Sequence, residues 1–259
     1  MDLGISGKRA LVTASSKGLG RGCAEALAAE GVSLVLNARG AEALEATAEE
    51  IRQTHDVEVQ TVAGNVAEPE IQSDLLRAAG EIDILVTNAG GPPPGYWQDW
   101  DREDFIKALD LNMLTPIALM RALMPGMCDR EWGRVVNITS MAVRSPASIL
   151  GLSNSARNGL TGYVAGTARQ VAPFGVTINN ILPGYHATDR MVALDGLRSK
   201  EAGVPVEEVH QERVQSIPAR RYGLPEEFGS LCAFLCSQHA GYIVGQNILH
   251  DGGFVNLTT

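Results

Sequence analysis

The stretch ALVTASSKGLGRGCAEALAAEG, from Ala10 to Gly31, decides the fold class. A short apolar run that ends at Thr13 is typical of a buried strand, a glycine-containing loop follows it, and an alanine-rich helical pattern begins near Gly18. Glycine permits a tight turn, and the first turn of a helix offers unpaired N–H groups and the positive end of its dipole to a phosphate. A strand, a glycine loop and a helix in this order predict a dinucleotide-binding βα unit.

The rest of the chain repeats this alternation of short apolar runs and longer amphipathic stretches. Strands are predicted at 10–13, 33–37, 57–65, 83–88, 134–139, 176–184 and 247–253, and helices are predicted to begin near Gly18, Ala41, Pro69, Asp101, Leu150 and Pro225. Such repeated βα units build a parallel sheet that is covered on both faces. We therefore expect an α/β chain of the Rossmann type: one domain over residues 1–259, doubly wound, with a seven-stranded parallel sheet and helices on both faces.

Composition narrows the function classes. With 259 residues and 45% hydrophobic content the chain can bury a large core, and its net charge of −9 without basic clusters argues against nucleic acid or an anionic membrane as a partner. Four cysteines at unrelated spacings form neither a disulfide framework nor a metal motif, so no metal is expected. No signal peptide and no apolar run near 20 residues is present, and a cytoplasmic protein is expected.

The segment 186–216 breaks the βα rhythm, because it is polar and charged and follows the sixth predicted strand. Ligands of doubly wound folds bind beyond the carboxyl ends of the strands. The segment is therefore interpreted as a substrate lid, and a plain surface excursion is the alternative.

Six features in the same order resemble the short-chain dehydrogenase/reductase family, and the resemblance covers essentially the whole chain. They are TASSKGLG from Thr13, TNAGG from Thr87, Asn112, VNITS ending at Ser140, ILPGYHATD from Ile181 and QNILHDGG from Gln246. The chain is most similar to divergent members of the 3-oxoacyl-acyl-carrier-protein reductases. The resemblance implies a nicotinamide cofactor held by Thr13, Ser15, Lys17, Gly18, Leu19, Gly20, Asn37, Arg39, Asn65, Val66, Asn88, Ala89, Gly90, Pro183, Gly184 and Thr188.

Charge predicts which nicotinamide is bound. An NAD site usually has an acidic residue at the end of the second strand, where this chain has Asn37, Ala38 and Arg39. Lys17 lies where NADP-using members of the family commonly carry a basic residue. Two cations near the 2′ position would favour a phosphate, so NADP(H) is expected over NAD(H).

Two residues depart from the family pattern at the cofactor site. Ala14 replaces the first glycine of the loop, which adds a methyl group near the adenosine ribose and restricts the backbone. Asn65 replaces an aspartate that contacts the adenine, although its amide can still form hydrogen bonds. An altered or weaker site is therefore expected.

The family's tyrosine and lysine are missing. Counting back from APFGVTINNILPG places Ser153 at the tyrosine position and Arg157 at the lysine position. An aliphatic hydroxyl is a poor proton donor compared with a tuned phenol, and arginine stays protonated at ordinary pH. Arg157 can still bind a ribose, a substrate carboxylate or a developing oxyanion.

Three residues are candidates for the lost acid: His186, Tyr185 and Tyr96, of which His186 ranks first because its loop should approach the nicotinamide. For each of them a packed or solvent-facing side chain is the simpler interpretation. The predicted catalytic set is Ser140, Asn112, Ser153, Arg157 and His186.

The leading hypothesis is an NADP(H)-dependent oxidoreductase that interconverts a carbonyl and an alcohol of a small molecule. A non-redox isomerase or dehydratase on the same fold, and a catalytically silent nucleotide-binding protein, are the alternatives. Arg144, Arg190 or Arg198 could meet an anionic substrate group. The resemblance also implies a homodimer or homotetramer.

Overall fold

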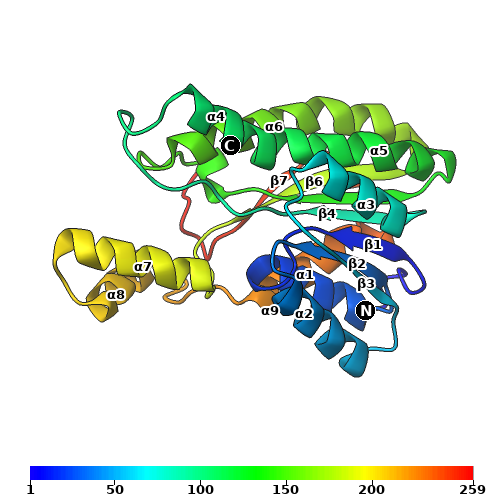
Figure 1. The fold of residues 1–259 in the computed structure, drawn as a ribbon, viewed down its shortest axis with the longest axis horizontal. Helices are drawn as coiled ribbons and strands as arrows, with labels where there is room; N and C mark the ends of the chain where they lie inside the picture. The colour runs from blue at the N-terminus through cyan, green and yellow to red at the C-terminus, as the bar shows by residue number, and fades with distance from the viewer. Residues whose placement is uncertain (259) are drawn as a thin grey trace.

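Seven parallel strands form one sheet in the order β3-β2-β1-β4-β5-β6-β7 in the computed structural model, which describes residues 1–258 (Figure 1). The strands are β1 (Arg9–Val12), β2 (Ser33–Ala38), β3 (Val59–Ala63), β4 (Ile84–Thr87), β5 (Gly133–Ile138), β6 (Val176–Pro183) and β7 (Asn247–His250). The chain winds outward from β1 to β3 and then returns to β4, so the strand order reverses between β1 and β4. The predicted single-domain, doubly wound α/β fold is confirmed.

Helices cover both faces of the sheet (Figure 1). One face carries α1 (Gly18–Ala29), α2 (Ala41–Thr54) and α9 (Pro225–Cys236), and the other carries α3 (Pro69–Ala79), α5 (Thr115–Asp129) and α6 (Gly151–Val171). Successive side chains of a strand point to opposite faces. In β1, Ala10 and Val12 therefore pack in the core under α1 and α9, whereas Leu11 packs in the core with α5 and α6.

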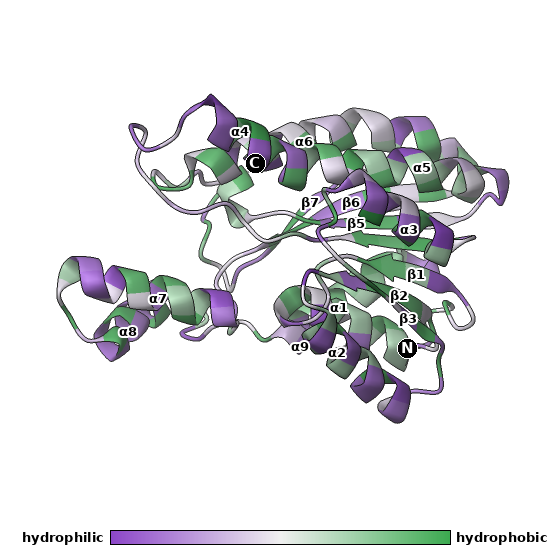
Figure 2. Ribbon diagram, viewed as in Figure 1, coloured by the Kyte–Doolittle hydropathy of each residue, from purple (hydrophilic) through white to green (hydrophobic). Residues whose placement is uncertain are grey.

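Hydropathy follows this layering. Figure 2 shows hydrophobic strands in the middle layer and hydrophilic residues concentrated on outer helices such as α2. Strands β4 and β5 are buried at every position, as expected for parallel strands covered on both faces.

The predicted helix near Asp101 consists of three pieces. Asp101 caps α4 (Arg102–Leu109) with a capping box, a π-helical turn η1 (Asp110–Leu114) follows, and α5 begins at Thr115. Short 3₁₀ turns occur at η2 (Met141–Val143), η3 (Ala172–Phe174) and η4 (Gln238–Ala240). π-helical turns are rare and occur mostly at functional sites. The break matters here because it carries Asn112.

Segment 186–216 contains two helices, α7 (Asp189–Ala202) and α8 (Val206–Ser216), which project away from the sheet (Figure 1). A buried carboxylate holds this helical pair to the chain that follows it: Asp195 accepts a hydrogen bond from the Tyr222 hydroxyl at 3.0 Å and lies 2.9 Å from Nε of Arg213. In the part of the chain that the structure describes, no helix combines the length and apolar character needed to cross a membrane.

Candidate functional site

The carboxyl ends of β1 and β4 are tied together at the point where the strand order reverses. The Thr13 hydroxyl donates to the Asn88 carbonyl at 2.7 Å and accepts from the Asn88 N–H at 2.8 Å, and the Asn88 amide donates to the Ala14 carbonyl at 3.2 Å. Ligands of open α/β sheets bind in the crevice at this reversal. These hydrogen bonds therefore hold together the two loops, after β1 and after β4, between which the candidate cofactor site lies.

The loop between β1 and α1 has the shape that a pyrophosphate requires. Gly18 has φ +58°, and a Cβ added to Gly20 would lie 2.3 Å from the Ala14 carbonyl oxygen and 2.8 Å from the Asn88 amide nitrogen. The side chain of Thr188 lies against Gly18 from the other side. The close approach of the backbone and the free N–H groups of α1 fit a dinucleotide.

Two residues predicted to hold the cofactor turn their side chains inward. The Ser15 hydroxyl donates to the Val12 carbonyl at 3.0 Å, and the Asn37 amide donates to the carbonyls of Val62 and Gly64 at 2.9 and 3.2 Å. Both residues are fully or almost fully buried. Their side chains therefore join the loop, β2 and β3, and the part that Ser15 and Asn37 play in cofactor binding stays a prediction.

The two cations expected near the 2′ position differ in their surroundings. Lys17 forms an exposed ion pair with Asp189 at 2.9 Å, whereas Arg39 is exposed and has no ion-pair partner among the described residues. Asn65 and the buried Val66 follow β3, and the Asn65 side chain accepts from the Ala67 N–H at 3.3 Å.

The remaining predicted cofactor residues lie on the loops around the crevice. Ala89 lines a cavity next to Asn88, and Gly90 continues the same loop. Pro183 ends β6, and Gly184 lies so close to Asp251 that an added Cβ would be 2.6 Å from the Asp251 Cβ. Packing against the chain after β7 thus explains the glycine at 184 without the cofactor.

Three of the predicted catalytic residues meet around α6. Arg157 donates from Nε to the Ser153 hydroxyl at 3.2 Å and from Nη1 to the Ile138 carbonyl at 2.8 Å. Arg157 and Asn112 line the same small cavity as Asn88, and both are buried. The two polar atoms of the Asn112 side chain have no hydrogen-bond partner within the described residues.

Ser140 comes to α6 from β5. Its hydroxyl accepts from the Ala142 N–H at 3.1 Å and so caps the turn η2, which packs against α6.

The surroundings of Arg157 change its pKa. Burial, and secondarily the charge of Arg190, lower the pKa of Arg157 to about 10. Arg157 is therefore a cation at neutral pH, as the sequence predicts.

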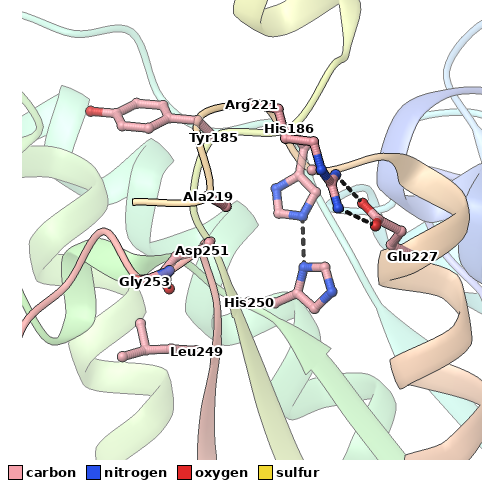
Figure 3. Close-up of a pocket in the computed structure, with 11 residues that line it drawn as sticks. Tyr185, His186, Ala219, Arg221, Glu227, Leu249, His250, Asp251 and Gly253 are labelled. Atoms are coloured by element: carbon pink, nitrogen blue, oxygen red, sulfur yellow. Dashed lines mark hydrogen bonds and ion pairs between the residues drawn. The ribbon is translucent and has the colours of Figure 1, made fainter. Parts of the chain in front are cut away.

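His186 does not join this group. Its ring lines a different cavity, where Nε2 lies 2.9 Å from Nδ1 of His250 (Figure 3). The ring also packs edge-on against Phe228. Burial lowers the pKa of His186 to about 4, so the ring is neutral at pH 7. The hypothesis that His186 replaces the tyrosine as acid therefore loses its structural support.

The two alternative acids are no better placed. Tyr185 packs edge-on against Phe254 with ring centroids 5.0 Å apart, and Arg213 lies over its ring. Tyr96 is 61% exposed on the loop before α4. No cluster of metal-ligating side chains occurs within residues 1–258.

Sequence reasoning missed two partners of the site. Asp189, next to Thr188, pairs with Lys17, and His250 at the end of β7 pairs with His186. Both contacts join residues more than 60 positions apart, and although Asp189 and His250 lie within ILPGYHATD and QNILHDGG, neither motif specifies its partner.

The comparisons with known proteins identify the family of the chain. A family model described as enoyl-(acyl carrier protein) reductase matches residues 13–255. The chain is 32% identical to D-beta-hydroxybutyrate dehydrogenase of Cupriavidus necator, with 97% of this chain and 99% of that protein covered. It is 31% identical to the 3-oxoacyl-(acyl-carrier-protein) reductase FabG of Aquifex aeolicus, with 98% and 99% covered.

The fold is also similar to that of a solved relative. L-sorbose reductase from Gluconobacter frateurii, in complex with NADPH and L-sorbose, superposes with a TM-score of 0.93 at 31% identity and 99% and 100% coverage. The chain is therefore an oxidoreductase that belongs to the short-chain dehydrogenase/reductase family and is similar to the 3-oxoacyl-acyl-carrier-protein reductases.

Proposed function

We propose that the chain catalyses the NADP(H)-dependent interconversion of a carbonyl and an alcohol, with Ser153 and Arg157 in place of the usual tyrosine and lysine. One observation carries this proposal: the Arg157 guanidinium bonds the Ser153 hydroxyl and lines one cavity with Asn112 and Asn88, beside the candidate cofactor crevice. Ser153 and Arg157, at the positions of the family's tyrosine and lysine, are thus joined by a hydrogen bond.

Both serines are set up as donors to a substrate oxygen. The Ser153 oxygen accepts from Arg157, and the Ser140 oxygen accepts from the Ala142 N–H. A hydroxyl whose oxygen accepts in this way keeps its hydrogen free to rotate toward another acceptor. Ser140 and Ser153 would polarise the carbonyl and stabilise the negative charge that develops on its oxygen.

Arg157 acts through charge and not through proton transfer. A cation that bonds the Ser153 oxygen favours the ionised form of that hydroxyl and so makes it a better acid. Because Arg157 keeps its own proton, the proton that reaches the product would come from water, either directly or through the Ser153 hydroxyl. The unpartnered Asn112 amide, in the same cavity, is suited to hold that water.

The cofactor supplies the hydride when it is bound, and we propose NADP(H) over NAD(H). Arg39 is exposed and can meet a 2′-phosphate, and β2 ends without a carboxylate. The similar L-sorbose reductase was solved in complex with NADPH.

We also propose that residues 186–216 act as a lid over the cofactor crevice. The start of α7 contacts the glycine loop through Thr188 and through the Lys17–Asp189 ion pair.

The test is the loss of NADPH absorbance with a panel of ketones and ketoses, compared between the parent and Ser140→Ala. Reduction that falls ~100-fold or more in this variant, with NADPH binding unchanged, supports the proposal. NADPH binding without reduction of any carbonyl, while a carbonyl substrate isomerises or loses water, would favour the non-redox alternative.

A further inference from the structure

Arg190, the second residue of α7, reaches across to the loop after β4. Its Nη1 donates to the Gly91 carbonyl at 3.1 Å and its Nη2 donates to the Pro92 carbonyl at 3.3 Å. A Cβ on Gly91 would lie 2.6 Å from Nη2, so the guanidinium lies tightly over this loop. Arg190 remains partly exposed to solvent, and the partial burial of its guanidinium lowers its pKa. All of its partners are neutral carbonyl oxygens.

Arg157 is a second cation with only neutral partners. It is 8% exposed and bonds a hydroxyl and a carbonyl. Within residues 1–258 no acidic side chain lies within ion-pair distance of Arg157 or Arg190, and the nearby Asp189 is paired with Lys17. Charged groups that are removed from water are nearly always paired, and Arg157 is such a group, whereas Arg190 is open to solvent and can be reached by a ligand.

The two guanidinium groups also act on each other. The charge of Arg190 lowers the pKa of Arg157, so the groups lie close enough to repel. Arg190 bonds the loop that follows Ala89, and Ala89 lines the cavity of Arg157 and Asn112. Two positive charges without acidic partners thus lie at this site, and its natural complement is an anion. A guanidinium presents a fork of N–H donors that matches the two oxygens of a carboxylate.

We propose that the substrate is an oxo acid or the corresponding hydroxy acid, whose carboxylate binds Arg190 in the field of Arg157. This inference rests on the proposed carbonyl chemistry and specifies its substrate class. Binding exchanges two hydrogen bonds to backbone carbonyls for a charge-assisted pair, which also places the substrate beneath the first turn of α7.

The phosphates of the cofactor are the other possible source of an anion. Their expected cradle is the glycine loop at Gly18 and Gly20, whereas Arg190 lies over Gly91 and Pro92 on the loop after β4. The carboxylate of the substrate is therefore the better match, and an experiment can separate the two.

The experiment compares acids with their methyl esters: pyruvate with methyl pyruvate and acetoacetate with methyl acetoacetate. Rates with NADPH are measured for the parent, Arg190→Gln and Arg190→Lys, together with calorimetric binding of each compound to the protein–NADP⁺ complex and of NADPH to the free protein. Arg77→Gln is the control, since Arg77 is an exposed arginine on α3 that already pairs with Asp74 at 2.8 Å and lies outside the proposed site.

We expect one acid to be preferred over its ester by ~10-fold or more in kcat/KM and in binding. Arg190→Gln should remove that preference by raising KM, Arg190→Lys should restore part of it, and Arg77→Gln should leave it intact. Equal binding of acid and ester in the parent overturns the inference. If the ester is nevertheless reduced, the proposed function stands.

Two further outcomes separate the inference from the proposed function. If Arg190→Gln weakens NADPH binding and leaves the acid preference intact, a cofactor phosphate is the partner and the inference is wrong. If nothing is reduced, the proposed function fails, and the calorimetric comparison still decides whether the carboxylate is bound.

Discussion

Ala14 lies in the glycine loop with φ +48°, in the left-handed region that side chains with a Cβ rarely adopt. Its carbonyl accepts the Asn88 amide and lies against Gly20, so the conformation is imposed by the contacts that close the loop. Left-handed backbone costs a residue with a Cβ about 1–2 kcal/mol.

Ala14→Gly should therefore raise the free energy of unfolding by up to about 1 kcal/mol and tighten NADPH binding, because the strain and the extra methyl group are both removed. Chemical denaturation and calorimetric titration measure the two effects. Ala46→Gly, the same change on the exposed face of α2, should lower the free energy of unfolding by about 1 kcal/mol. Similar losses in both variants would show that Ala14 carries no strain.

Arg39 tests cofactor choice at a single exposed side chain. Removing a charge-assisted hydrogen bond to a 2′-phosphate costs ~1.5 to 3 kcal/mol, so Arg39→Ala should weaken NADPH binding ~10-fold or more and leave NADH binding unchanged. Calorimetric titration of both cofactors is the measurement. The preference is absent if the unmutated protein binds NADPH and NADH equally well.

At the scale of the elements, a histidine pair joins β7 to the base of the projecting helices. His186 lies in a one-residue bridge to Gly223, and its ring bonds His250 at the end of β7 (Figure 3). Burial also lowers the pKa of His250. Both rings are held neutral, which makes this connection sensitive to acid.

The sign of the effect follows from the pKa of His186, which falls from 6.5 in the unfolded chain to about 4 in the folded protein. The unfolded state binds the proton first, so the contribution of His186 is complete above about pH 6.5 and decreases as the pH falls toward 4. The parent should therefore lose more stability between pH 7 and pH 5 than His186→Gln, whose amide can still meet His250.

Chemical denaturation at both pH values measures this loss. The exposed His239→Gln variant should behave like the parent. An equal loss in the parent and in His186→Gln would mean that His186 does not cause the acid sensitivity.

Helix starts were predicted well because they depend on local chemistry. The predicted starts at Gly18, Ala41, Pro69 and Pro225 are the observed ones, and Asp101 is an N-cap. The π-helical turn at Asn112 was not predicted, because the choice between helix types depends on packing against α6, which the local sequence does not encode.

At the scale of the molecule, the decisive prediction concerns a double variant in which the family's tyrosine and lysine are placed at positions 153 and 157. Ser153→Tyr together with Arg157→Lys should raise NADPH-dependent ketone reduction ~100-fold or more, because a positioned general acid contributes at least that much. The double change is needed, since a tyrosine without the lysine keeps a high pKa, and Arg157 bonds the Ser153 oxygen and lies in the space of the ring.

Steady-state rates of the single and double variants, with NADPH affinity as the check on folding, are the measurement. No gain in a double variant that still binds NADPH would show that the native pocket is not adapted from a working reductase site. The expected homo-oligomer stays a prediction, and sedimentation of the parent protein tests it.

The sequence by itself determined the fold class and the start of the helix after the glycine loop, because strand periodicity and turn chemistry are local properties. Only the tertiary structure decided the partners of the charged side chains. Lys17 meets Asp189, Arg190 meets Gly91 and His186 meets His250 across separations that no local pattern specifies. Parallel strands end at one edge of a sheet, so residues distant in the chain converge there, and the direction of each side chain depends on packing that is set by the whole fold.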